Sequence, residues 1–113
     1  MESTDISFRV IHDTLFIRMC GAFGYGTSLN LKRLLSKNEM FRCSHVEFDL
    51  ANVSAIDSSG LGLIKAIARD VKKQGGRLSI VNARPHVHQV LELVNLSRLL
   101  QIHPLQREAL RGA

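Results

Sequence analysis

Cysteines, long apolar runs and repeats are scarce or missing in this chain of 113 residues, and each absence excludes a class of protein. Cys20 and Cys43 are the only cysteines. Without a Cys-x-x-Cys spacing they indicate neither a disulfide framework nor a zinc site, so we expect free thiols in a reducing compartment. No apolar run reaches the roughly 20 residues that cross a bilayer. Because the opening segment 1–5 is polar and acidic, unlike a signal peptide, we expect a cytoplasmic protein without membrane insertion.

Acidic residues are outnumbered, with 15 Lys and Arg against 10 Asp and Glu and a formal net charge of +5. A basic surface attracts nucleic acid or anionic lipid, but a solvated helix face explains the same residues. Aromatic residues do not alternate with the cations as they do in a single-strand binder. We therefore expect no direct nucleic-acid partner, and keep nucleotide or lipid binding by the basic face as an alternative. Seven of the cations are Lys65, Arg69, Lys72, Lys73, Arg77, Arg84 and Arg98.

Hydrophobic periodicity predicts one α/β domain over residues 1–113. Alternating or continuous apolar segments predict strands at 6–10, 15–19, 46–50, 78–81 and 101–103. Helical spacing predicts three helices. One is capped by Thr27 or Ser28 and carries Leu31, Leu34 and Leu35 on one face, one over 61–71 is closed by Gly75-Gly76, and one begins at Pro85 and carries inward residues as far as Val94. Gly21, Gly24 and Gly26 predict a loop. We expect the tail 104–113 to be a short helix or a frayed end.

The predicted element order is β-β-α-β-α-β-α-β. The first two strands form a hairpin, and the alternation that follows requires crossover connections between parallel neighbours. We therefore predict a mixed, mostly parallel sheet with helices packed on it. The carboxyl ends of its strands form the functional edge, where the Gly21–Gly26 loop and the turn at Ser58 are expected to be neighbours.

The most informative segment is the turn Asp57-Ser58-Ser59-Gly60, which lies between an apolar strand and an amphipathic helix. Such a turn points free backbone N–H groups and the positive end of a helix dipole at the serines. This environment suits an anion, including a phosphate attached to a serine.

The sequence lacks the residues that enzymatic chemistry at this turn would need. A nucleophilic serine would need a Gly-x-Ser-x-Gly elbow and a placed histidine, and a P-loop would need its lysine. The pair His86-x-His88 falls at an apparent helix start, where residues two apart diverge, so we predict no metal site. The sequence therefore predicts no enzyme, no catalytic residue and no cofactor.

Two interpretations of the turn remain open from the residues alone. Phosphorylation of Ser58 adds about −1.5 to −2 charges and would expel a partner from this surface. Alternatively, Asp57 and Ser58 only cap the helix, and Gly60 and Gly62 only permit close helix–sheet packing.

The segment Asp57-Ser58-Ser59-Gly60-Leu61-Gly62, after the strand Val46–Leu50, resembles the signature of the STAS domain family, and the chain is similar to its bacterial anti-sigma factor antagonists along nearly its whole length. The resemblance implies partner switching in the regulation of transcription. The unphosphorylated form would bind a serine protein kinase that is also the anti-sigma factor and has a histidine-kinase-like ATPase domain. The bound kinase would then release its client, typically a sigma factor. Phosphorylation at Ser58, with Ser59 as the fallback site, would abolish binding, and a metal-dependent serine phosphatase would reverse it. ATP and Mg²⁺ belong to those partners.

Two features depart from that family. Gly21-Ala22-Phe23-Gly24-Tyr25 stands where the antagonists usually carry an acidic stretch, with Phe23 in place of an expected Asp, and the net charge is basic. Either Phe23 and Tyr25 anchor a different partner, or Phe23 belongs to the core. The predicted partner-binding residues are Asp57, Ser58, Ser59, Gly60, Phe23, Gly24 and Tyr25. The departures also motivate an alternative function, an accessory subunit bound to a membrane transporter ATPase without phospho-switching.

Overall fold

A single sheet organises the part of the chain that the computed structural model describes, residues 6–37, 43–93 and 101–104. Its five strands are adjacent in chain order, the first pair antiparallel and the others parallel. The predicted α/β class, mixed sheet and element order are confirmed. The elements are β1 (Ile6–Ile11), β2 (Thr14–Phe23), α1 (Tyr25–Lys37), β3 (His45–Ile56), α2 (Ser58–Lys73), β4 (Arg77–Ala83), α3 (Pro85–Leu93) and β5 (Gln101–Pro104).

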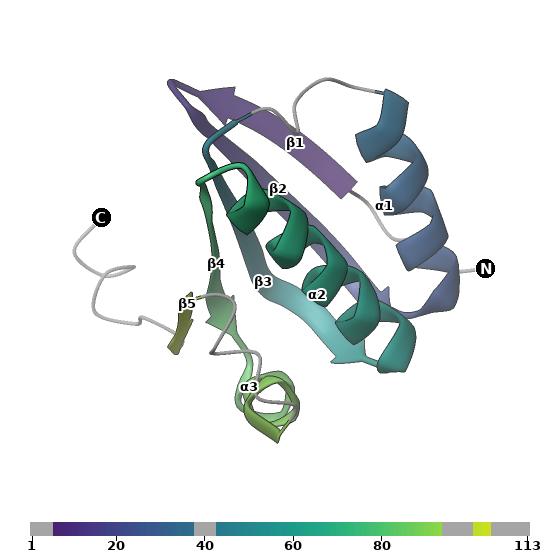
Figure 1. Cartoon of the computed structure of the whole chain (residues 1–113). Coiled ribbons are helices and arrows are strands. Elements are labelled where there is room, and N and C mark those ends of the chain that lie inside the picture. Colours follow the sequence, from purple (N-terminus) through teal and green to yellow (C-terminus); the bar gives the residue numbers. More distant parts are fainter. Residues whose placement is uncertain (1–5, 38–42, 94–100, 105–113) are drawn as a thin grey trace.

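The core lies between the sheet and its helices. Figure 1 shows α1 and α2 side by side over one face of the sheet. Alternate residues of β2 and β3 point to that face, because side chains of a strand alternate between its two sides. The fully buried side chains they contribute are Leu15, Ile17, Met19, Val46, Phe48 and Leu50, and α2 adds Ile64, Ile67, Ala68 and Val71.

Helix α2 ends where the glycine pair predicts. Gly75 has a φ of +81°, a conformation that glycine adopts readily because it has no Cβ. Its N–H donates to the carbonyl of Lys72 at 3.0 Å, and the N–H of Gly76 donates to the carbonyl of Val71 at 2.9 Å. These two bonds form a Schellman motif. The N–H of Arg77 then donates to the Ser44 carbonyl at 2.9 Å, so the chain enters β4 beside the start of β3.

The predicted loop at Gly21–Gly26 is wrong. The strand β2 continues to Phe23, and α1 begins at Tyr25, with the N–H of Ser28 donating to the Gly24 carbonyl at 2.8 Å. Register shifts against β3 absorb the irregularity, and Gly21, with a φ of +96°, lies at one of them. A bulge therefore takes the place of a loop. Thr27 and Ser28, the predicted caps, lie inside the helix.

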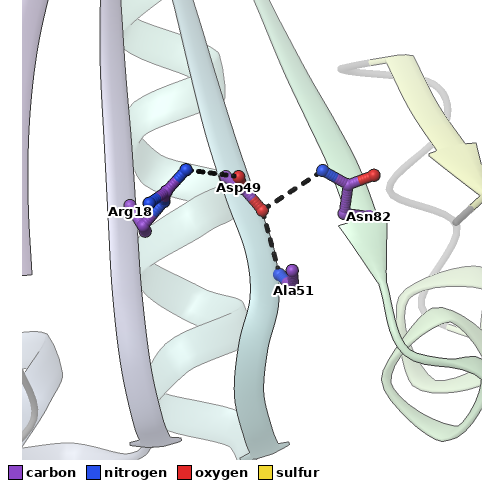
Figure 2. Close-up of polar contacts among 4 residues, drawn as sticks. All are labelled: Arg18, Asp49, Ala51 and Asn82. Atoms are coloured by element: carbon purple, nitrogen blue, oxygen red, sulfur yellow. Dashed lines mark hydrogen bonds and ion pairs between the residues drawn. The ribbon is translucent and has the colours of Figure 1, made fainter. Parts of the chain in front are cut away.

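A polar cluster marks the point where β3 separates from β4. Pairing of these strands ends at Asp49, whereas β3 stays paired with β2 as far as Ile56. Figure 2 shows Arg18 and Asn82, from the two neighbouring strands, on either side of Asp49. The Asp49 carboxylate accepts hydrogen bonds from the Ala51 N–H at 3.0 Å and the Asn82 amide at 3.3 Å, and it pairs with Arg18 at 3.6 Å. The carboxylate thus accepts a hydrogen bond from the β3 backbone at Ala51, past Asp49, the last β3 residue that pairs with β4.

Both cysteines are free and partly buried. Desolvation, followed by the negative charge of Asp13, raises the pKa of the Cys43 thiol above its ordinary value. A thiol with a raised pKa is a poor nucleophile, because the thiolate is the reactive form. In the described ranges, no helix has both the length and the apolar character needed to span a bilayer. The predictions for Val94, for Arg98 and for the tail beyond Pro104 fall outside the described residues.

Candidate functional site

Asp57 holds the turn between β3 and α2. Its backbone is extended, and its carboxylate accepts hydrogen bonds from the N–H groups of Ser59 at 2.8 Å and Gly60 at 3.1 Å. The carbonyl of Asp57 accepts the first intrahelical bond, from the Leu61 N–H at 3.0 Å. Asp57 is therefore the N-cap of α2, and an N-cap of this kind stabilises a helix by about 0.5–2 kcal/mol.

Ser58 is the first residue of α2, and it is exposed. Ser59, the next hydroxyl, is half-buried, and its N–H is already bonded to Asp57. The Ser58 side chain is therefore more accessible to solvent than that of Ser59. The first turn of α2 contains no acidic residue, so the negative charge nearest to Ser58 along the helix is that of its own cap.

The end of β2 lies beside this turn, as the topology predicted for the glycine-rich segment. Phe23 and Ile56 are paired in the parallel register of β2 and β3. The N–H of Asp57 donates to the Phe23 carbonyl at 3.3 Å. A Cβ added to Gly60 would lie 2.5 Å from that same carbonyl oxygen and 3.1 Å from Cγ of Phe23. Gly60 thus permits a close approach that fixes the start of α2 against the end of β2.

Of the two aromatic residues in the predicted partner surface, one is buried and the other is exposed. Phe23 is 0% exposed and belongs to the core, so its side chain offers no contact to a partner. That part of the predicted partner surface is wrong, because the inward alternation of β2 continues through the bulge to its last residue. Tyr25 is 68% exposed at the first position of α1.

The Asp57 carboxylate lies between the N-terminal ends of two helices. One oxygen, Oδ1, accepts the bonds from α2, and the other, Oδ2, lies 3.0 Å from the position of a Cβ added to Gly24, the residue that precedes α1. Positive helix ends stabilise nearby negative charge by about 0.3–1 kcal/mol each. A second negative charge at Ser58 would meet the favourable field of the start of α2 and the opposing charge of Asp57.

Leu29 is an exposed apolar residue of α1 that the sequence analysis did not single out. It lies four residues after Tyr25 on α1, so the two side chains share one helix face, and Leu29 is 45% exposed. The signal was present, because Leu29 stands outside the stripe of Leu31 and Leu35 that faces the core. Together, Tyr25 and Leu29 form an apolar surface at the beginning of α1.

The two histidines of the His86-x-His88 motif have separate contacts. His86 lies 2.6 Å from the Ser54 carbonyl through Nε2, and His88 lies 3.7 Å from the carboxylate of Glu92. Both residues are in α3, where side chains two positions apart point in different directions. No group of three or more metal-ligating side chains occurs in the residues that the structure covers.

Substitution of the two glycines of α2 should separate close packing from helix propensity. We expect Gly60→Ala to lower the free energy of unfolding by about 1–3 kcal/mol, because the new methyl group would overlap the Phe23 carbonyl. Gly62→Ala is the matched control. Nothing lies within 4 Å of its added Cβ, so alanine should raise the free energy of unfolding by about 0.5–1 kcal/mol. Urea denaturation measures both, and equal effects would contradict the packing role of Gly60.

Comparison with known proteins identifies the fold. The model of the STAS domain family matches residues 5–109. An anti-sigma F factor antagonist of Paenibacillus polymyxa is 28% identical over 97 residues, which cover 85% of this chain and 83% of that protein.

Solved structures share the architecture at lower identity. The anti-sigma factor antagonist SpoIIAA in its unphosphorylated form has a TM-score of 0.72 at 18% identity, covering 96% of each chain. The phosphorylated form of Bacillus SpoIIAA also has a TM-score of 0.72, at 19% identity, covering 96% of this chain and 97% of that one. A sulfate transporter family protein of Wolinella succinogenes has a TM-score of 0.71 at 18% identity, covering 83% and 79%. The chain belongs to the STAS domain family.

Proposed function

We propose that this chain is a non-enzymatic phospho-switch. Its unphosphorylated form binds a serine kinase that is also an anti-sigma factor, and the kinase then releases its client, typically a sigma factor. Phosphorylation of Ser58 abolishes the binding, and a metal-dependent serine phosphatase restores it. The observation that carries the proposal is the exposed hydroxyl of Ser58 at the first position of α2, beside a cap that orders the turn.

The surroundings of Ser58 support acceptance of a phosphate rather than catalysis by the serine. Asp57 uses one carboxylate oxygen, Oδ1, to accept two backbone N–H groups, so its structural role is that of a cap. The Nε2 atoms of His45, His86 and His88 contact Ser79, the Ser54 carbonyl and Glu92 in turn. A general base must lie within hydrogen-bond reach of the hydroxyl it activates, and these contacts of the three histidines are with residues other than Ser58.

The relatives support the same assignment. The relative from Paenibacillus polymyxa is named an anti-sigma F factor antagonist, and it matches most of this chain. SpoIIAA, which has this fold, is known in a phosphorylated and an unphosphorylated form. These relationships favour a regulatory protein whose state depends on phosphate.

The direct test is phosphorylation in vitro. The chain is incubated with candidate serine kinases of its own organism, ATP and Mg²⁺, and the modified residue is mapped by mass spectrometry. We expect one phosphate, on Ser58, and none on Ser58→Ala. Ser59→Ala should be modified as well as the wild type, because the Ser59 side chain is half-buried. Failure of every kinase to modify Ser58 or Ser59 would refute the proposal.

One observation favours a second function. A sulfate transporter family protein has the same fold, and this chain carries a net charge of +5. The alternative is therefore an accessory subunit on a membrane transporter ATPase, without phospho-switching. Co-purification with an ATPase subunit that is equal for the wild type and Ser58→Asp would support this alternative over the first proposal.

A further inference from the structure

The outward face of α2 carries the Ser58 hydroxyl at one end and four cations along the rest. An ideal helix turns about 100° per residue, so residues at the right spacing project in one direction. The opposite face is buried, which leaves this one to solvent. The exposed residues that share an arc of roughly 100° are Ser58, Gly62, Lys65, Arg69, Lys72 and Lys73. We name the four cations among them, Lys65, Arg69, Lys72 and Lys73, the basic ridge.

The charges of the basic ridge are not neutralised within the described structure. The ion pairs found in residues 6–37, 43–93 and 101–104 join Arg18 to Asp49 and His88 to Glu92, away from the ridge. Asp70, the acidic residue of α2, lies outside this arc and three residues before Lys73, but the ion pairs found in the described residues do not include it. Four positive charges on one side of one helix therefore remain available to a partner.

Helix stability explains only part of the basic ridge. Lys72 and Lys73 lie in the last turn of α2, where cations favour the negative end of the helix dipole. Lys65 and Arg69 lie in the middle turns, where the dipole gives them no such role. A solvated face would also tolerate acidic side chains there, and α2 has none on this arc.

The basic ridge is continuous with the proposed phosphosite. Lys65 follows Ser58 by seven residues, a rise of about 10 Å along the helix axis. Surfaces of two folded proteins that form a stable contact extend over about 800 Å² on each side. A protein that covers Ser58 therefore also covers the first part of the ridge. On the neighbouring helix, the exposed Tyr25 and Leu29 add an apolar surface that a protein partner can bury.

We propose that the basic ridge docks an acidic surface of the protein partner that recognises Ser58. This inference rests on the proposed phospho-switch and adds the chemistry of the partner. A phosphate of about −1.5 to −2 charges at the end of the ridge offsets up to half of its four positive charges. The same phosphate faces the acidic surface of the partner. Release then has two electrostatic causes, a weaker attraction by the ridge and a direct repulsion at Ser58.

The test compares two double variants in binding to the kinase that phosphorylates Ser58. Lys65→Gln with Arg69→Gln removes two ridge charges and keeps good helix formers. Arg9→Gln with Arg77→Gln is the matched control, because both arginines are exposed and lie on strands, outside α2. We expect the ridge variant to bind about tenfold more weakly at low salt, mainly through slower association, and to depend less on salt. The control should stay within about twofold of the wild type.

The outcomes separate this inference from the proposed function. Phosphorylation of Ser58 by the kinase, read by mass spectrometry, tests the function alone. If Ser58 is modified but the ridge variant binds as tightly as the wild type, the docking role of the ridge is overturned and the switch stands. If no kinase modifies Ser58, the function fails, and the inference fails with it. Ridge-dependent binding of the isolated chain to phosphatidylserine vesicles or duplex DNA at physiological salt would overturn the choice of a protein as the occupant.

Discussion

Phe23→Ala should lower the free energy of unfolding by about 3–5 kcal/mol. The ring is 0% exposed and lies at the end of β2, where its carbonyl also accepts the N–H of Asp57. Removing the ring leaves a cavity whose cost depends on how far its surroundings can collapse. Gly60 lies against the ring and has no side chain that could move into the space. We therefore expect a loss in the usual range for a large aromatic residue.

Tyr25→Ala is the control for this prediction. Tyr25 is two residues further along the chain but 68% exposed, and alanine is a good helix former at the start of α1. Its effect on the free energy of unfolding should stay within about 0.5 kcal/mol. Urea denaturation of both variants gives the comparison. Similar losses of unfolding free energy for the two variants would contradict the assignment of Phe23 to the core and Tyr25 to the surface.

Ser58→Asp should weaken binding to the kinase by about a hundredfold, while the free energy of unfolding changes by less than about 1 kcal/mol. The side chain is exposed in the free protein, so a carboxylate there has full contact with water. Beneath a partner with an acidic surface, as proposed for the basic ridge, the same carboxylate loses that hydration and faces like charge, and Asp57 beside it is also negative. The penalty therefore falls on the complex and not on the fold.

The matched control for Ser58→Asp is Ser7→Asp. Ser7 is also an exposed serine, but it lies on β1, the edge strand of the hairpin. It is paired with Arg18 of β2. We expect binding within about twofold of the wild type for this variant. Titration calorimetry with the purified kinase gives both affinities. Equal weakening by the two substitutions would assign the effect to net charge and not to the position of Ser58.

Local signals in the sequence predicted much of the fold. Asp57 at the cap, Gly75-Gly76 at the end of α2 and Pro85 at the start of α3 each depend on the conformational preference of a residue within its own segment. Such preferences act without the rest of the chain. The order of strands and helices followed from them, and with it the neighbouring positions of Asp57 and Phe23.

The errors arose where the structure depends on distant parts of the chain. The strand β3 extends to Ile56, past its predicted end at Leu50, because β2 continues to pair with it. Gly21 is accommodated as a bulge in that pairing and does not break the strand. The burial of Phe23 depends on Gly60, which is far along the sequence and contributes only the space left by a missing side chain. The alternation of β2 points Phe23 inward, but no pattern within β2 shows that Gly60 leaves room for its ring.

The measurement that tests the account most directly is the affinity of the Ser58 kinase for the chain before and after authentic phosphorylation. We predict that the phosphate on Ser58 weakens binding by about a thousandfold, which corresponds to about 4 kcal/mol, with the urea midpoint of the chain nearly unchanged. Dephosphorylation should restore the original affinity. Equal affinities for the two forms would contradict the claim that an exposed hydroxyl at the start of α2 controls partner binding.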